Sequence, residues 1–105
     1  MTYWIAVTEH PLDHPVRMSV EGKPVKFREI PDVGLFCYQS QVIFDGWRVA
    51  EVVTGNGIAQ GDTRNQAVAE AHKRIIAQGA EKVRAGIAKT TPVMDLPVHP
   101  YELGE

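Results

Sequence analysis

The sequence predicts an α+β fold in which an antiparallel sheet of four to five strands carries one C-terminal helix on one face. Two observations support this prediction. The first half of the chain holds short segments rich in β-branched and aromatic residues, separated by turn signals. The second half holds a single stretch with helical periodicity, which ends at Lys89. We therefore expect one α+β domain over residues 1–89 and an extended, Pro-rich tail over residues 90–105.

The first three strands follow from the residues before position 30. The segment YWIAVTE near the N-terminus is typical of a strand. In residues 16–29 apolar and polar side chains alternate, and a two-residue turn at Gly22-Lys23 would place Val20 opposite Val25 and Met18 opposite Phe27. Both apolar pairs then share one face, so we expect a hairpin here.

A second hairpin is expected over residues 36–54. The dipeptide Asp45-Gly46 is a strong signal for a tight turn. The resulting register places six apolar residues on one face in three pairs: Phe44 with Trp47, Val42 with Val49, and Tyr38 with Val53. It also brings Glu51 onto that face, a conflict that a β-bulge or a sheet edge would relieve.

The helix is expected to begin at Asp62 or Thr63. Thr63 and Gln66 fit the capping box, in which side chains satisfy the free N–H groups of the first turn. Gly79 costs about 1 kcal/mol relative to Ala inside a helix, so the helix can break there. Beyond Lys89 the prolines exclude a helix. The tail is nevertheless apolar, so we expect it to dock on its own sheet or on a neighbouring subunit.

Length and composition exclude several classes of protein. A chain of 105 residues suits one domain with a modest core, and 44% hydrophobic with 23% charged residues is ordinary for a soluble protein. No apolar run is long enough to span a membrane, and the N-terminus lacks the basic start of a signal peptide. Cys37 is the single cysteine, which favours a reducing cytoplasm.

Residues 55–66, GNGIAQGDTRNQ, combine three glycines with a helix start, as many phosphate-binding loops do. Their spacing is G-x-G-x-x-x-G rather than the dinucleotide fingerprint, and no G-K-[ST] sequence is present. We therefore interpret these glycines as turn and capping residues. The alternative is an anion site at Gly61, Thr63 and Arg64, although Asp62 would repel an anion there.

Candidate catalytic and metal-binding residues are few. The segment EHPLDHP presents four potential metal ligands, Glu9, His10, Asp13 and His14. A proline follows each histidine and holds it in extended geometry, and no further Cys or His motif completes a closed site. Cys37 is far in sequence from every histidine, and His72 falls on the apolar side of the helix. We therefore expect no metal, no cofactor and no enzymatic activity.

The sheet face away from the helix is the main candidate binding surface. The predicted registers place four cations on it, Arg17, Lys26, Arg28 and Arg48, which we name the predicted basic face. Arg17 and Arg28 would lie directly opposite each other, and like charges in that arrangement destabilise a sheet. An acidic protein partner would relieve the repulsion, and a homo-oligomer is a further option. RNA or DNA is the alternative partner and ranks second, because the net charge of the chain is −2.

Two local resemblances accompany these patterns, each over about a third of the chain. GDTRNQAVAEAHKRI resembles the helix start of HicB-type antitoxins, and IPDVG is similar to a turn those proteins carry. That resemblance implies a partner-binding, RNase H-like fragment. The β-β-β-α order resembles the double-stranded-RNA-binding domain, which grips phosphates at its last helix. From all this we expect a small non-catalytic protein-binding module, such as a regulator or inhibitor from a phage or mobile element.

Overall fold

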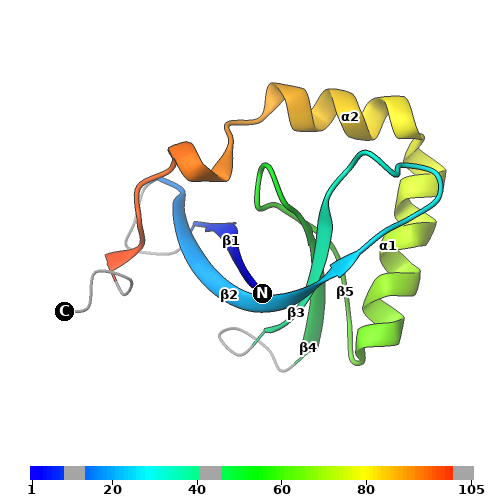
Figure 1. The fold of residues 1–105 in the computed structure, drawn as a ribbon, viewed down its shortest axis with the longest axis horizontal. Coiled ribbons are helices and arrows are strands. Elements are labelled where there is room, and N and C mark those ends of the chain that lie inside the picture. Colours follow the sequence, from blue (N-terminus) through cyan, green and yellow to red (C-terminus); the bar gives the residue numbers. More distant parts are fainter. Residues whose placement is uncertain (9–13, 41–45, 101–105) are drawn as a thin grey trace.

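The computed structural model describes residues 1–8, 14–40 and 46–100, and it confirms an α+β fold (Figure 1). Five strands form one antiparallel sheet whose spatial order is the order along the chain. The elements are β1 (Thr2–Val7), β2 (Val16–Val25), β3 (Leu35–Ser40), β4 (Gly46–Glu51), β5 (Gly57–Gly61), α1 (Arg64–Gln78), α2 (Ala80–Lys89) and a short 3-10 helix η1 (Val93–Asp95). No helix in the described ranges is long and apolar enough to cross a membrane.

The predicted hairpin at Gly22-Lys23 is wrong, because β2 runs straight through these residues. The first half of β2 pairs with β1, and Gly22 and Lys23 then pair with Tyr38 and Cys37 of β3. A Cβ added at Gly22 would lie 2.8 Å from the Cys37 carbonyl oxygen. The glycine therefore marks a close backbone approach inside a strand, which sequence alone does not distinguish from a turn.

Gly22 also lets the sheet curl. The rings of Tyr3 and Phe36, which come from strands on either side of β2, stack with their centroids 4.3 Å apart and meet over this glycine. At the far side of β1, the Ala6 amide donates to the Gly55 carbonyl of the β4–β5 turn at 3.0 Å. Figure 1 shows β2 bending as a long arc around this curled sheet. The curl gives the sheet a concave face that buries side chains without a helix.

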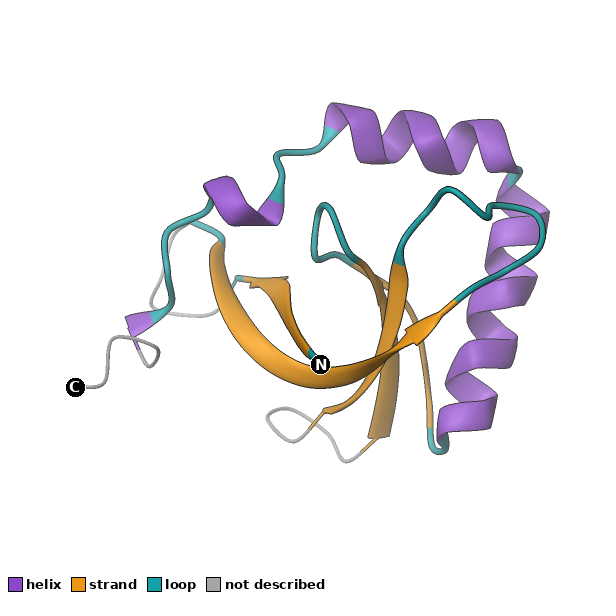
Figure 2. Cartoon of the chain, viewed as in Figure 1, coloured by secondary structure: helices purple, strands orange, loops and turns teal. Residues whose placement is uncertain are grey.

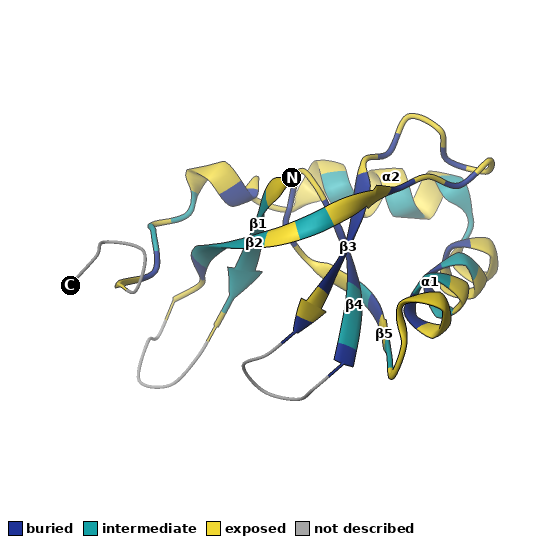
Figure 3. Cartoon of the chain, turned by 60° about the horizontal axis from the view of Figure 1, so that its bottom comes forward, coloured by how far each residue is buried: buried dark blue, intermediate teal, exposed yellow. Residues whose placement is uncertain are grey.

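Apolar residues therefore cluster on both faces of the sheet. Phe36, Tyr38 and Ala50 are buried on the concave face, and side chains of β1 and β2 pack against them. On the opposite face α1 packs Ala67, Ala71 and Ile75 against a second cluster from the strands, which includes Leu35, Cys37, Val49 and Ala59. Figure 3 shows burial along much of β3, which lies between the two clusters.

The second predicted hairpin exists, but its register is wrong. Tyr38 pairs with Arg48 and Cys37 with Val49, so Tyr38 does not pair with Val53. The shift is an odd number of residues, and it therefore moves Tyr38 to the face opposite Val49 and Trp47. The predicted pairs that involve Val42 and Phe44, and the turn residue Asp45, lie outside the described residues. Gly46 is the first residue of β4.

Glu51 lies on the helix-side face, as expected, and its side chain is only 3% exposed. The pairing of β4 with β5 does shift register between Val49 and Ala50, next to Glu51, but this irregularity leaves the carboxylate buried. Instead the carboxylate accepts hydrogen bonds from the amides of Val53 and Thr54 and from the Thr54 hydroxyl. A buried carboxylate is stable where such donors replace water. Glu51 therefore holds together the β4–β5 turn.

The helical region agrees with its sequence signals. Thr63 is the N-cap of α1, and its hydroxyl accepts from the Gln66 amide at 3.1 Å. The helix breaks at Gly79, where φ is +92°, and α2 continues in a new direction (Figure 2). Helix α2 contains no buried residue. A bidentate pair between Arg84 and Asp32, at 2.8 and 3.0 Å, ties it to the turn before β3.

The described part of the tail docks on its own sheet, which confirms one of the two expected locations. The Val93 amide donates to the Val53 carbonyl at 2.8 Å, and the Val93 side chain is buried. Arg17 forms a parallel bridge with Val98 through two backbone hydrogen bonds, to Pro97 and from His99. The short helix η1 interrupts the extended chain, contrary to the expectation of a tail without helix. The division of the chain at residue 90 stays a prediction.

Candidate binding groove between β2 and α1

A groove runs between the end of β2 and the first turns of α1, and we name it the β2–α1 groove. Its lining residues are Pro24, Val25, Lys26, Phe27, Arg64, Asn65, Val68, Ala69 and His72. Val25 and Phe27 are buried, and Val68 is half-buried, so the floor of the groove is apolar. Lys26 and Arg64 are exposed. The site therefore combines an apolar floor with cationic side chains.

The charged residues that line the β2–α1 groove are all positive. None of its nine described lining residues is a carboxylate. Lys26 and Arg64 form no ion pair with any described residue. Lys23 pairs across the strands with Cys37, and Arg64 also lies close to the Cys37 thiol, so a third cation stands near the groove. These positive charges are uncompensated within the described chain.

One acidic residue approaches the groove at its His72 end, where it is already engaged. Glu29 lies 2.9 Å from Nε2 of His72, and this contact is the main cause that lowers the pKa of the Glu29 carboxyl. The His72 ring stacks on Phe27 with centroids 4.7 Å apart. His72 is thus held by a carboxylate on one side and an aromatic ring on the other, and it forms a fixed end wall.

Cys37 lies beneath the Arg64 side of the groove and is only 1% exposed. Burial raises the pKa of its thiol, and the nearby Arg64 guanidinium opposes that rise. A thiol with a raised pKa is a poor nucleophile, because the thiolate is the reactive form. The side chain therefore acts as a small core residue.

The structure separates the four residues of the predicted basic face. Arg17 pairs with Ala6 rather than with Arg28, and its guanidinium lies 4.7 Å above the Trp4 ring and donates to Met94 Sδ at 3.1 Å. Arg48 stands beside Tyr38, where burial raises the pKa of the phenol and Arg48 opposes the rise. Because β2 does not fold back at Gly22, Lys26 and Arg28 lie in the segment after it. Of the four, only Lys26 lines the β2–α1 groove.

The predicted anion site is also divided. Thr63 uses its hydroxyl to cap Gln66, and the Asp62 amide donates to the Gln66 side-chain oxygen at 3.0 Å. Gly61 packs tightly against α1, since an added Cβ would lie 2.6 Å from the Ala67 amide nitrogen. Arg64 instead belongs to the β2–α1 groove. The amides of Asp62, Gln66 and Ala67 at this helix start thus already have partners from the protein itself.

Among the described residues, no group of three or more His, Cys, Asp or Glu side chains could hold a metal ion. Glu9, His10 and Asp13 lie outside the described residues, and His14 is exposed. The lining of the β2–α1 groove could be anticipated only in part. The alternation of apolar and polar residues over 16–29 predicts that Val25 and Phe27 share the face on the helix side, but it assigns Lys26 to the opposite face and gives no sign that Lys26 and Arg64 line one groove.

Comparison with protein-family models, with curated proteins and with solved structures finds no match. The resemblances to HicB-type antitoxins and to double-stranded-RNA-binding domains therefore stay predictions.

Proposed function

We propose that this chain is a non-catalytic protein-binding module whose β2–α1 groove takes an acidic, partly apolar segment of a partner protein. One observation carries the proposal: Lys26 and Arg64, 38 positions apart in sequence, line one apolar groove without a carboxylate among its described lining residues. An apolar floor with a charged rim is the usual anatomy of a protein-binding site. Complementary charge on the partner would speed association and set the orientation of the segment.

A protein fits the groove better than a nucleic acid does. Binding to a polyanion draws its strength from the number of phosphates that the protein neutralises. Among the described residues Lys26 and Arg64 line the groove and Lys23 lies close by, whereas Arg17, Arg28 and Arg48 do not line it. Phe27 is buried, so His72 is the one aromatic ring that the described lining exposes for base stacking, and its ring is already stacked on Phe27 and paired with Glu29. We place this regulator or inhibitor in the cytoplasm, where its single cysteine would stay reduced.

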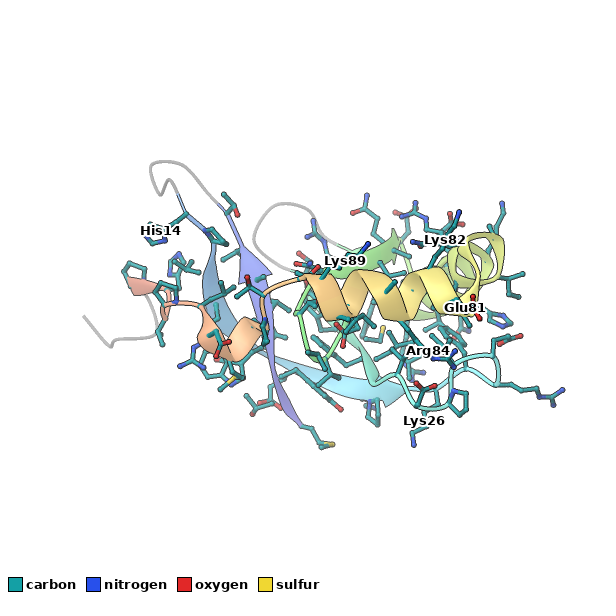
Figure 4. The ribbon with its side chains drawn as sticks, turned by 90° about the horizontal axis from the view of Figure 1, so that it is seen from above. His14, Lys26, Glu81, Lys82, Arg84 and Lys89 are labelled. Carbon is teal, nitrogen blue, oxygen red and sulfur yellow. The ribbon has the colours of Figure 1, made fainter. Side chains whose placement is uncertain are left out.

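Fluorescence anisotropy with defined probes tests the proposal. The probes are a labelled peptide of alternating glutamate and leucine, its lysine–leucine counterpart and a short single-stranded RNA. We expect the acidic peptide alone to bind, and the double variant K26E/R64E to bind it at least about tenfold more weakly, because two attractive rim charges become repulsive. A charge-matched control is K82E/K89E, which changes two exposed lysines of α2 away from the Lys26 side (Figure 4).

The outcomes separate the alternatives. Equal weakening by K26E/R64E and K82E/K89E would mean that net charge, not the groove, attracts the peptide. Tighter binding of the RNA than of the acidic peptide, lost in K26E/R64E, would assign the groove to nucleic acid. Failure of the acidic peptide to bind would reject the proposed occupant.

A further inference from the structure

Strand β5 has a free edge along the opposite flank of α1. Among the described residues β5 pairs with β4 alone. The Glu51 amide donates to the Asn56 carbonyl, so the backbone groups of Glu51, and by alternation those of Val49 and Trp47, point toward β5. The residues opposite Val49 and Trp47, Ala59 and Gly61, therefore point back toward β4, and a register shift between Val49 and Ala50 leaves Ile58 without a paired residue on β4. Gln60 lies between Ala59 and Gly61, and its N–H and C=O face outward from the sheet.

Side chains of α1 occupy the backbone groups on either side of Gln60. Arg74 donates to the Ile58 carbonyl at 2.8 Å, and the Gln66 side-chain oxygen accepts from the Asp62 amide at 3.0 Å. A neighbouring strand would offer the same two groups, an N–H to the carbonyl and a C=O to the amide. Both side chains are exposed, so a strand can displace them. The outward backbone groups of β5 therefore have the spacing and the hydrogen-bonding roles that pairing with another strand requires.

The sequence of β5 does not protect this edge. Natural edge strands are blunted by charged residues or proline, and GIAQG contains neither. A groove runs beside the strand, lined by Gln60, Gly61, Asp62, Gln66, Ala69, Glu70, Lys73 and Arg74. Its two acidic residues and two basic residues balance one another. A balanced groove complements a copy of itself.

We propose that a second copy of this chain pairs with β5 in antiparallel fashion, about a twofold axis at Gln60. Gln60 then exchanges two hydrogen bonds with its own counterpart. Ile58 lies opposite Asp62 of the second copy, so the Asp62 amide of each chain donates to the Ile58 carbonyl of the other. Ala59 lies opposite Gly61 at the closely spaced, non-hydrogen-bonded position, where two small residues allow close approach.

Charge selects this register and this occupant. The incoming strand takes the Ile58 carbonyl from Arg74, and the guanidinium stays beside that residue because it also pairs with Glu70 of its own helix at 3.2 Å. Asp62 of the second copy lies opposite Ile58, within reach of that guanidinium. The twofold axis repeats the Arg74–Asp62 pair, so each chain contributes one cation and one anion to the interface. The interface is isologous and closes at a dimer.

Sedimentation equilibrium on the purified chain tests the proposal. We expect a mass twice the 11.6 kDa of one chain at high protein concentration, with dissociation on dilution. D62K and R74E should each weaken the dimer by roughly tenfold or more, because each places like charges across the axis. The double variant D62K/R74E should restore it, because the pair is then reversed rather than broken. D32K is the matched control, because it changes a charge of another surface pair and should leave the mass unchanged.

A backbone variant tests the strand pairing separately. Q60P removes the outward N–H and leaves the hydrogen bonds to β4 in place, so it should yield a folded monomer. Circular dichroism of each variant establishes that the fold persists. A wild-type monomer at all concentrations, a dimer that survives in Q60P, or failure of D62K/R74E to restore the dimer would each overturn the proposal. Because Lys26 and Arg64 are not part of this interface, its failure leaves the acidic-peptide proposal standing.

Discussion

Replacing Glu51 by glutamine should destabilise the protein far more than its isosteric shape suggests. The carboxylate is 3% exposed and accepts from Val53, from the Thr54 amide and from the Thr54 hydroxyl. Glutamine exchanges one accepting oxygen for an NH₂ group that faces these donors. Hydrogen bonds to charged groups contribute about 1.5–3 kcal/mol each, and a buried donor left without an acceptor costs about 1–3 kcal/mol. We expect a loss of about 2–4 kcal/mol.

Urea unfolding followed by tryptophan fluorescence measures this loss directly. In a small domain it corresponds to a fall in Tm of about 8–32 °C, at roughly 4–8 °C per kcal/mol. The variant Thr54→Val removes the hydroxyl that donates to Glu51 and accepts from the Asn56 amide, and it keeps the two amides that donate to Glu51, so it should lose about 1–3 kcal/mol. Exposed Glu81→Gln serves as the control and should change stability by about 1 kcal/mol or less, since its charge acts only on the first turn of α2.

The same substitution should loosen two contacts that the β4–β5 turn makes. Gly55 accepts from Ala6 of β1, and Val53 accepts from Val93 of the tail. Trypsin should therefore cleave after Lys89 faster in Glu51→Gln than in the wild type at equal fraction folded. A stability within about 0.5 kcal/mol of wild type, as for an ordinary surface change, would refute the reasoning.

Two further predictions concern acid pH and the helix glycines. The pKa values of Glu21, Glu29 and Asp32 are lowered, chiefly by Thr2, His72 and Arg84 respectively. A lowered carboxyl pKa contributes stability that is present above the unfolded values of 4.5 for Glu and 3.8 for Asp, and it is lost as pH falls through the folded values. The urea midpoint should thus decrease as the pH is lowered below about 5, and it should decrease less steeply in Asp32→Asn than in the wild type. The same pH dependence in both proteins would show that the Asp32–Arg84 pair contributes nothing to acid stability. For the glycines, Gly79→Ala should cost about 1 kcal/mol or more because its φ of +92° strains any L side chain, whereas helical Gly86→Ala should gain about 0.5–1 kcal/mol. Urea unfolding of both variants checks the pair, and a gain from Gly79→Ala would contradict the observed backbone.

Local signals in the sequence predict where helices and strands lie better than they predict which residues pair across the sheet. The N-cap at Thr63 and the break at Gly79 depend on neighbouring residues, and the structure confirms both. The docking of the tail, by contrast, follows from its apolar composition alone, which does not specify its partners on the sheet. The two wrong registers share one cause. Each prediction rests on one turn signal, Gly22-Lys23 or Asp45-Gly46, whereas register depends on contacts made across the whole sheet.

The candidate site was harder to predict than the fold. The sequence predicts binding roles for both Lys26 and Arg64, but on different surfaces, and their meeting in one groove depends on where α1 lies against β2. The periodicity of β2 and that of α1 each indicate which face is apolar, but neither indicates where α1 packs against β2. Conversely, the apolar run Leu35–Tyr38 does carry a signal for burial on both faces, because strands covered on both sides lose their alternation.

That run has a consequence for how the molecule opens. Leu35 and Cys37 belong to the cluster under α1, whereas Phe36 and Tyr38 belong to the cluster inside the curl of the sheet. A fluctuation that lifts α1 away still leaves the backbone of β3 bonded to β2 and β4 on either side. The amides of β3 should therefore exchange with deuterium only through global unfolding, while those of α2 exchange through small local openings. Because β3 contributes side chains to both hydrophobic clusters, we expect the two clusters to unfold together in one cooperative transition.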